Sequence, residues 1–255
     1  MELAGRAALI TGGGTGTGRA VALELARRGC HVAVNYSKSR QEAEDTAAEI
    51  TALGVRGLAV QADVGNDAAV RRMVDEVANA FGRLDVLVTS AGATAFVPHA
   101  DLEALSDADW DKILNTNLKG TFYCIRAALP WLRQDNGAVV NISSIAGVYA
   151  IGSSLAYCAS KAAINNMTVA LARALAPAVR VNAVAPGFID TRWWKEFPAY
   201  EVMKGMAVAQ TLVGKPCQPE DVAATVVHLA TADFVTGQVW VIDGGHGIAG
   251  GMPRL

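Results

Sequence analysis

The 255-residue sequence lacks a strong net charge and a long apolar run. Its formal net charge is −2, so it offers no basic surface for nucleic acid or for an anionic membrane. Its apolar runs are broken by glycine or by charged residues and are too short to span a bilayer. The opening residues, M-E-L-A-G-R, do not have the basic and then apolar layout of a secretory signal peptide. We therefore expect a cytoplasmic protein with no nucleic-acid or membrane partner.

The cysteines and histidines do not form a metal-binding pattern. The four cysteines lie far apart and include no C-x-x-C motif; they are Cys30, Cys124, Cys158 and Cys217. The four histidines show no ligand spacing, so we predict no metal site. Widely separated cysteines fit a reducing compartment, and we interpret Cys158 as a small packing residue rather than a reactive thiol. His99 and His246 fall near the expected cleft.

A large apolar fraction is arranged in a regular alternation. Hydrophobic residues make up 52% of the chain and charged residues 18%, which suits a sizeable core. Short apolar runs predict strands at 7–10, 31–35, 56–61, 84–89, 138–143, 179–185 and 238–242. Helical patterns follow the first strand to about residue 28 and recur at 39–53, 67–81, 107–133 (kinked near Pro130), 155–176 and 219–231. This alternation predicts an α/β fold with one doubly wound domain, residues 1–255, and a seven-stranded parallel sheet.

A glycine-rich turn, T-G-G-G-T-G-T-G, joins the first strand to the first helix. Gly12, Gly16 and Gly18 allow the backbone to approach a pyrophosphate closely, and the amides at the helix N-terminus favour its negative charge. Glycine is common in ordinary turns, so the cluster alone is a weak signal. Its position between a first strand and a first helix favours a nucleotide site.

The stretch at 144–161 places a phenol and an ammonium four residues apart on a predicted helix. Tyr157 and Lys161 then stand on one helix face, with the Ser144 hydroxyl upstream of both. A lysine beside a phenol stabilises the phenolate, so we expect the pKa of Tyr157 to fall toward 7, a change of about 4 kcal/mol. The alternative is a helix that carries the two residues by chance.

These residues should converge in space. Ligands of doubly wound sheets bind beyond the carboxyl ends of the strands, where the strand order reverses. The predicted strand ends carry Gly12, Asn35, Asp63, Gly92, Ser144, Pro186 and Gly187. Residues that are scattered along the chain therefore indicate one common site.

The motifs also occur in a fixed order along nearly the whole chain. They are T-G-x-x-x-G-x-G at 11–18, A-G at 91–92, N-L-x-G at 117–120, Ser144, Y-x-x-x-K at 157–161, P-G at 186–187 and V-I-D-G-G at 241–245. In this order and spacing the sequence resembles the short-chain dehydrogenase/reductase family, and within it the branch of 3-oxoacyl-carrier-protein reductases and glucose dehydrogenases. The resemblance implies a single-domain Rossmann fold, a nicotinamide cofactor and hydride transfer at a carbonyl or secondary alcohol.

The resemblance also implies a role for each candidate catalytic residue. Tyr157 would exchange a proton with the substrate oxygen as general acid or base. Ser144 would hydrogen-bond that oxygen, and Lys161 would hold the nicotinamide ribose and lower the pKa of Tyr157. Asn117 would anchor a water that links Lys161 to solvent. Each has a plainer alternative; Asn117, for example, could be a helix-bend residue.

The resemblance places further residues around the cofactor. The implied cofactor-binding residues are Gly12, Gly14, Thr15, Gly16, Gly18, Asn35, Tyr36, Ser37, Lys38, Asp63, Val64, Ser90, Ala91, Gly92, Tyr157, Lys161, Pro186, Gly187, Ile189 and Thr191. Ser90 stands where the family usually has asparagine. At the end of the second strand, Asn35 replaces the acidic residue of NAD users, and Lys38 and Arg40 follow. We therefore favour NADP(H), with NAD(H) as the alternative.

The substrate site is less defined. Its expected walls are 93–96, 146–155 with Tyr149 and Ile151, and an aromatic lid at about 187–215 with Trp193 and Trp194. Such walls favour an apolar or ring-containing carbonyl compound, although the lid could serve only to cover the cofactor or pack on another subunit. Small and apolar residues on the helices at 107–133 and 155–176, with the family resemblance, predict a homotetramer. The rival hypothesis is a non-enzymatic dinucleotide-binding sensor or scaffold.

Overall fold

The structure is a computed structural model that describes residues 1–191 and 200–249. Within these ranges, seven parallel strands form one sheet in the order β3-β2-β1-β4-β5-β6-β7. The strands are β1 (Ala7–Thr11), β2 (His31–Tyr36), β3 (Gly57–Gln61), β4 (Val86–Thr89), β5 (Gly137–Ile142), β6 (Val179–Pro186) and β7 (Val239–Ile242). The strand order reverses between β1 and β4, as in a Rossmann-type fold. The predicted doubly wound parallel sheet is confirmed.

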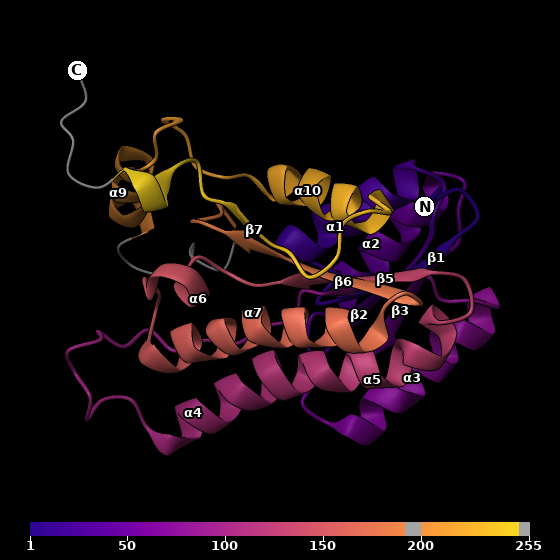
Figure 1. The fold of residues 1–255 in the computed structure, drawn as a ribbon, viewed down its shortest axis with the longest axis horizontal. Helices are drawn as coiled ribbons and strands as arrows, with labels where there is room; N and C mark the ends of the chain where they lie inside the picture. The colour runs from indigo at the N-terminus through magenta and orange to yellow at the C-terminus, as the bar shows by residue number, and fades with distance from the viewer. Residues whose placement is uncertain (192–199, 250–255) are drawn as a thin grey trace.

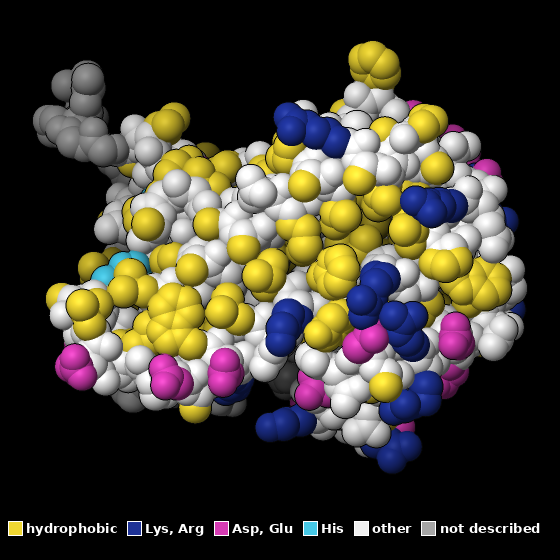
Figure 2. Space-filling model, turned by 60° about the horizontal axis from the view of Figure 1, so that its bottom comes forward, with side chains coloured by type: hydrophobic (Ala, Val, Ile, Leu, Met, Phe, Trp, Pro, Cys, Tyr) yellow, Lys and Arg dark blue, Asp and Glu magenta, His cyan; other side chains and the backbone are white. Residues whose placement is uncertain are grey.

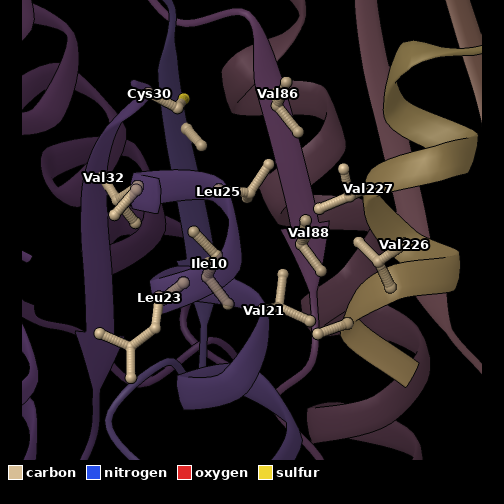
Figure 3. Close-up of a cluster of buried hydrophobic side chains, with 14 of the residues drawn as sticks. Ile10, Val21, Leu23, Leu25, Cys30, Val32, Val86, Val88, Val226 and Val227 are labelled. Carbon is tan, nitrogen blue, oxygen red and sulfur yellow. The ribbon is translucent and has the colours of Figure 1, made fainter. Parts of the chain in front are cut away.

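Helices cover both faces of this sheet. In Figure 1, α1 (Gly16–Arg27), α2 (Arg40–Ala52) and α10 (Pro219–Thr231) lie above it, and α3 (Asp67–Phe81), α5 (Gly120–Leu132) and α7 (Leu155–Leu175) lie below it. Figure 3 shows the upper core, where Ile10 and Val88 of the sheet meet Val21 of α1 and Val226 of α10. A second apolar cluster fills the space below the sheet. Burial on both faces explains why the strands are apolar at nearly every position.

The long helix predicted at 107–133 is interrupted. Helix α4 (Asp107–Ile113) begins at Ser106, whose side chain forms a capping box with Asp109. A π-helical segment, Leu114–Lys119, then leads into α5. Extra residues in a helical turn often occur at functional sites, and this one carries Asn117. Pro130 lies near the end of α5.

Two short helices occupy segments where no helix was predicted. Helix α6 (Ala146–Tyr149) follows β5, and α9 (Tyr200–Gln210) lies within the long connection at 186–216. Both stand at the left of Figure 1, beyond the carboxyl ends of the strands. Helix α9 has no buried residue, so its sequence carries no clear apolar stripe. Trp193 and Trp194, predicted in the lid, lie outside the described residues.

Candidate active site

The carboxyl ends of β1, β4, β5 and β6 meet at one edge of the sheet. Thr11, at the end of β1, accepts hydrogen bonds through Oγ1 from the backbone N–H groups of Ser90 (2.9 Å) and Ala91 (3.0 Å). The Pro186 carbonyl, at the end of β6, accepts one from the N–H of Ile145, just after β5 (3.0 Å). The predicted convergence of scattered segments is therefore present in the structure.

The glycine-rich turn after β1 is packed too closely for side chains. A Cβ on Gly14 would lie 2.9 Å from the backbone of α2, and one on Gly18 would lie 2.3 Å from the Gly12 carbonyl oxygen. Gly12 and Gly16 have positive φ angles of 63° and 51°, which favour glycine. Thr15 is the N-cap of α1, whose first turn holds no acidic side chain. The turn thus fits a dinucleotide diphosphate held by backbone N–H groups.

Two other segments predicted to hold the cofactor lie beside this turn. A Cβ on Gly12 would lie 3.1 Å from Ala91 Cα, and one on Gly16 would lie 3.6 Å from Thr191 Cγ2. Ile189 forms an isolated parallel bridge to the segment before α10, which fixes the backbone after β6. The residues expected around the diphosphate and the nicotinamide are therefore neighbours.

Asn35, which stands at the position of the acidic residue of NAD users, is buried. Its side chain is 2% exposed; Nδ2 donates to the Ala62 carbonyl (3.0 Å), and Oδ1 accepts from the Gly12 N–H (3.4 Å). Asn35 therefore joins the glycine-rich turn to the end of β3, because a buried amide must satisfy its hydrogen-bonding groups within the protein. Ser37 and Lys38 are the exposed side chains at this place.

The remaining residues at this end of the sheet are divided between surface and core. Tyr36 is buried at the end of β2. Asp63 is exposed and accepts a hydrogen bond from the Gly65 N–H (2.9 Å), whereas Val64 is buried against Gly120. Of these three residues, Asp63 is the one whose side chain is open to solvent.

The candidate catalytic side chains meet between α6 and the start of α7. Ser154 caps α7 by accepting a hydrogen bond from the Tyr157 N–H (3.3 Å). One turn on, Lys161 Nζ lies 5.5 Å from the centre of the Tyr157 ring and donates to the Ile142 carbonyl (2.8 Å). The Ser144 side chain is hydrogen-bonded to that of Tyr157. The structure therefore brings the predicted hydroxyl, phenol and ammonium groups together.

The predicted lowering of the Tyr157 pKa is not found. Burial raises the pKa of Tyr157 to about 12, and the hydrogen bond with Ser144 only partly offsets this. Burial also lowers the pKa of Lys161 to about 8. The loss of water around each side chain is the largest cause of its shift, so the protein keeps Tyr157 neutral at neutral pH.

Asn117 is fully buried, and its side-chain amide forms hydrogen bonds with the protein. Oδ1 accepts from the Ala93 N–H (2.7 Å), and Nδ2 donates to the Ala93 carbonyl (3.0 Å) and to Ser160 Oγ (3.0 Å). The side chain thus ties the segment after β4 to the residue that precedes Lys161. Its predicted role in anchoring a water stays a prediction.

A cavity of about 520 Å³ opens beside this cluster. It is lined by Phe96, Val97, Pro98, His99, Ala150, Ile151, Gly152 and Ser153. Phe96 and Ile151 come from the two predicted substrate walls and give the cavity an apolar lining. Cys158 Sγ lies 3.8 Å from His99 Nε2, and burial raises the thiol pKa, which agrees with a packing role.

Tyr149 packs against the chain after β7. A Cβ on Gly247 would lie 2.2 Å from Tyr149 Cζ, so the ring covers this glycine. Tyr149 is not among the residues that line the 520 Å³ cavity. Its predicted position in the substrate wall stays a prediction.

Sequence analysis did not identify several residues that hold the site together. Thr11 binds the backbone after β4, and Asn165 of α7 contacts both Ser143 and the Gly147 carbonyl. Thr11, a polar residue at the end of an apolar run, carried a signal because a buried hydroxyl needs protein partners, whereas Asn165 carried none. The sequence did not say which partners.

Among residues 1–191 and 200–249, no group of histidine, cysteine and carboxylate side chains is arranged to hold a metal ion. No helix in these ranges has the length and apolar content needed to cross a membrane.

Comparison with known proteins gives consistent matches over nearly the whole chain. A family model described as enoyl-(acyl carrier protein) reductase matches residues 12–247. A ketoacyl reductase of the granaticin polyketide synthase of Streptomyces violaceoruber is 44% identical over 239 residues, 93% of this chain and 94% of that protein. The 3-oxoacyl-acyl-carrier-protein reductase FabG of Staphylococcus aureus is 40% identical over 94% of this chain and 97% of its own.

A solved structure also matches. A short-chain dehydrogenase of Burkholderia cenocepacia J2315, in complex with NADP, superposes with a TM-score of 0.88 at 36% identity. The match covers 97% of this chain and all of that one.

Proposed function

The chain belongs to the short-chain dehydrogenase/reductase family and is an oxidoreductase, and from this premise we propose that it transfers a hydride between NADP(H) and the 3-oxo group of an acyl thioester. The observation that carries the proposal is the cluster of Ser144, Tyr157 and Lys161, which lies at the same sheet edge as the glycine-rich turn and next to an apolar cavity. The thioester class is supported by the names of the ketoacyl and 3-oxoacyl reductases among its relatives.

The side chains divide the reaction between them. When bound, the nicotinamide cofactor supplies the hydride to the carbonyl carbon. Tyr157 donates its proton to the carbonyl oxygen, and Ser144 donates a hydrogen bond to that oxygen as negative charge develops. Because the pKa of Tyr157 is raised, the phenol holds its proton at neutral pH. The proton that reduction of the ketone requires is therefore present on Tyr157 near pH 7.

Lys161 supports this chemistry from the buried side of the phenol. Its Nζ atom is held by the Ile142 carbonyl, and its side chain is 5% exposed. From this position the ammonium would hold the ribose hydroxyls of the nicotinamide and return a proton toward Tyr157 after each turnover. Asn117, tied to Ser160, would keep the helix turn between Tyr157 and Lys161 in register.

NADP(H) is favoured by the groups at the end of β2. The buried Asn35 presents no carboxylate there, and Ser37 and Lys38 are exposed where a 2′-phosphate would lie. Arg40 is less available because its Nε atom is paired with Glu44 (2.8 Å). Lys38 is therefore the cation that we expect to recognise the phosphate.

A homotetramer is favoured by apolar side chains on two exposed faces. Figure 2 turns the lower helical layer toward the viewer and shows hydrophobic side chains spread over much of it. Phe122 of α5 and Leu155 of α7 are 40% and 37% exposed, and Trp240 and Val241 are similarly exposed on the edge strand β7. Light scattering is expected to give about four times the 26.6 kDa chain mass; a monomer would contradict this.

A turnover assay tests the proposed activity. Purified protein is mixed with NADPH and a series of 3-oxoacyl thioesters of different chain length, and loss of NADPH absorbance is followed, with matched 3-hydroxyacyl thioesters as blanks. We expect NADPH oxidation that depends on the ketone and favours apolar acyl chains. Tight NADPH binding without turnover across the series would instead favour a non-enzymatic sensor or scaffold.

A further inference from the structure

Asn165 forms hydrogen bonds with both ends of the segment that carries Ser144. It lies one turn beyond Lys161 on α7, and its Oδ1 atom is 2.5 Å from the donor Ser143 Oγ. Its Nδ2 atom donates to the Gly147 carbonyl at 3.1 Å. One amide side chain thus uses both of its ends to join α7 to residues 143 and 147.

The segment between these contacts is packed directly on α7. A Cβ on Gly147 would lie 2.4 Å from the carbonyl carbon of Lys161, so α6 touches the helix backbone at that residue. The Ser143 hydroxyl also lies 3.3 Å from the Lys161 carbonyl oxygen. Ser144 is therefore held between two points that are both fixed to the turn of α7 carrying Lys161.

Local hydrogen bonds connect Ser144 to the rest of this segment, so fixing residues 143 and 147 also fixes the Ser144 hydroxyl. Ser144 Oγ accepts from the Ala146 N–H (3.1 Å), and the Ser144 carbonyl accepts from the Gly147 N–H (3.0 Å). A shift of residue 143 or 147 would move this turn and change the distance from the Ser144 hydroxyl to Tyr157.

We propose that Asn165 is a positioning residue of the reductase, which holds the Ser144 hydroxyl against the Tyr157 phenol by bridging Ser143 and Gly147. The role rests on the proposed function, and in it Asn165 acts through Ser144. Displacing a catalytic group by about 1 Å costs up to roughly 100-fold in rate, so the bridge has a measurable kinetic effect.

The chain offers a matched control in the next residue. Asn166 is on the same helix, has the same side chain and is exposed to solvent. Asn165→Ala and Asn166→Ala therefore remove the same atoms from α7, but only the first removes the bridge. We expect Asn165→Ala to lower kcat roughly 10- to 100-fold while KM changes less than about threefold, and Asn166→Ala to match the wild type.

A second comparison separates positioning from general stability. If Asn165 acts through Ser144, Asn165→Ala should cost less than about twofold in kcat when Ser144→Ala is already present. NADPH binding, measured by fluorescence, should be unchanged in all variants. Should Asn165→Ala be unstable, Ser143→Ala removes the hydrogen bond between Ser143 and Asn165. Its loss of kcat should likewise become smaller when Ser144→Ala is already present.

Each outcome bears on a different statement. Equal rates for Asn165→Ala and Asn166→Ala, or the same loss with and without Ser144, would overturn the positioning role while leaving the reductase intact. Wild-type protein that turns over no 3-oxoacyl thioester would overturn the proposed function itself and, with it, this role.

Discussion

Lys161 Nζ lies 5.5 Å from the centre of the Tyr157 ring and donates its hydrogen bond to the backbone carbonyl of Ile142 rather than to the phenol. The lysine is therefore anchored to the end of β5, and the tyrosine is free to pair with Ser144. This arrangement separates the charged lysine from the tyrosine that we propose as the proton donor. It also makes the ionisation of both side chains depend on burial.

The burial of Lys161 predicts a pH-dependent stability. Its pKa is about 8 in the folded chain and 10.5 when exposed, so between these values the unfolded chain holds a proton that the folded chain has released. The free energy of unfolding therefore rises with pH in this window. Relative to Lys161→Met, which lacks this group, wild-type stability should increase by about 2 kcal/mol between pH 7 and pH 9.5.

Urea unfolding of both proteins over this range measures the effect. Measurements stop below pH 10, because above it the raised pKa of Tyr157 acts in the opposite direction: the folded chain then keeps a proton that the unfolded chain loses. A constant difference between the two proteins would mean that Lys161 is not desolvated as the structure indicates.

Lys38 should decide the choice of cofactor. Lys38→Ala is expected to lower kcat/KM for NADPH about 10-fold and to leave that for NADH unchanged, because only NADPH carries the 2′-phosphate. Arg40→Ala is the control, since Arg40 is already paired with Glu44 and should have a smaller effect. Wild-type kcat/KM that is higher for NADH than for NADPH would refute the assignment.

Asp190 should hold helix α9 over the site. Its carboxylate accepts from the Tyr200 hydroxyl (2.5 Å) and pairs with Lys204 (2.5 Å), and it lies between two residues of the segment proposed to hold the nicotinamide. Asp190→Ala should raise KM for the thioester roughly fivefold, the equivalent of about 1 kcal/mol, with a smaller change in kcat. Glu201→Ala, an exposed change on the same helix, should leave KM for the thioester unaltered. If Asp190→Ala and Glu201→Ala change this KM equally, helix α9 does not act as a lid held by Asp190.

The sequence predicted the elements whose signals are local. Asp67–Phe81 begins after Asn66, whose side chain caps it, and ends at Gly82 in the left-handed conformation, so both bounds were correct. Pro219 marked the start of α10 in the same way. The Tyr157 and Lys161 pair was also predicted, because its spacing repeats a helix turn, and Ser144 was predicted from the family resemblance.

Features that depend on distant partners were missed. The burial of Asn35 follows from its contacts with Gly12 and Ala62, and no local pattern reports them. The packing of Tyr149 on Gly247 likewise joins residues far apart in the chain. Nothing in the pair Asn165-Asn166 says which of the two faces inward. The direction of the Tyr157 pKa shift was wrong because burial, which sequence spacing does not report, is the largest cause and raises the pKa.

The rate of NADPH-dependent ketone reduction by Tyr157→Phe tests the central claim most directly, because this change removes only the phenol oxygen. With NADPH binding unchanged, kcat should fall at least about 100-fold, the effect expected when a general acid is lost. A variant that binds NADPH and reduces the thioester at the wild-type rate would show that the proton comes from another group.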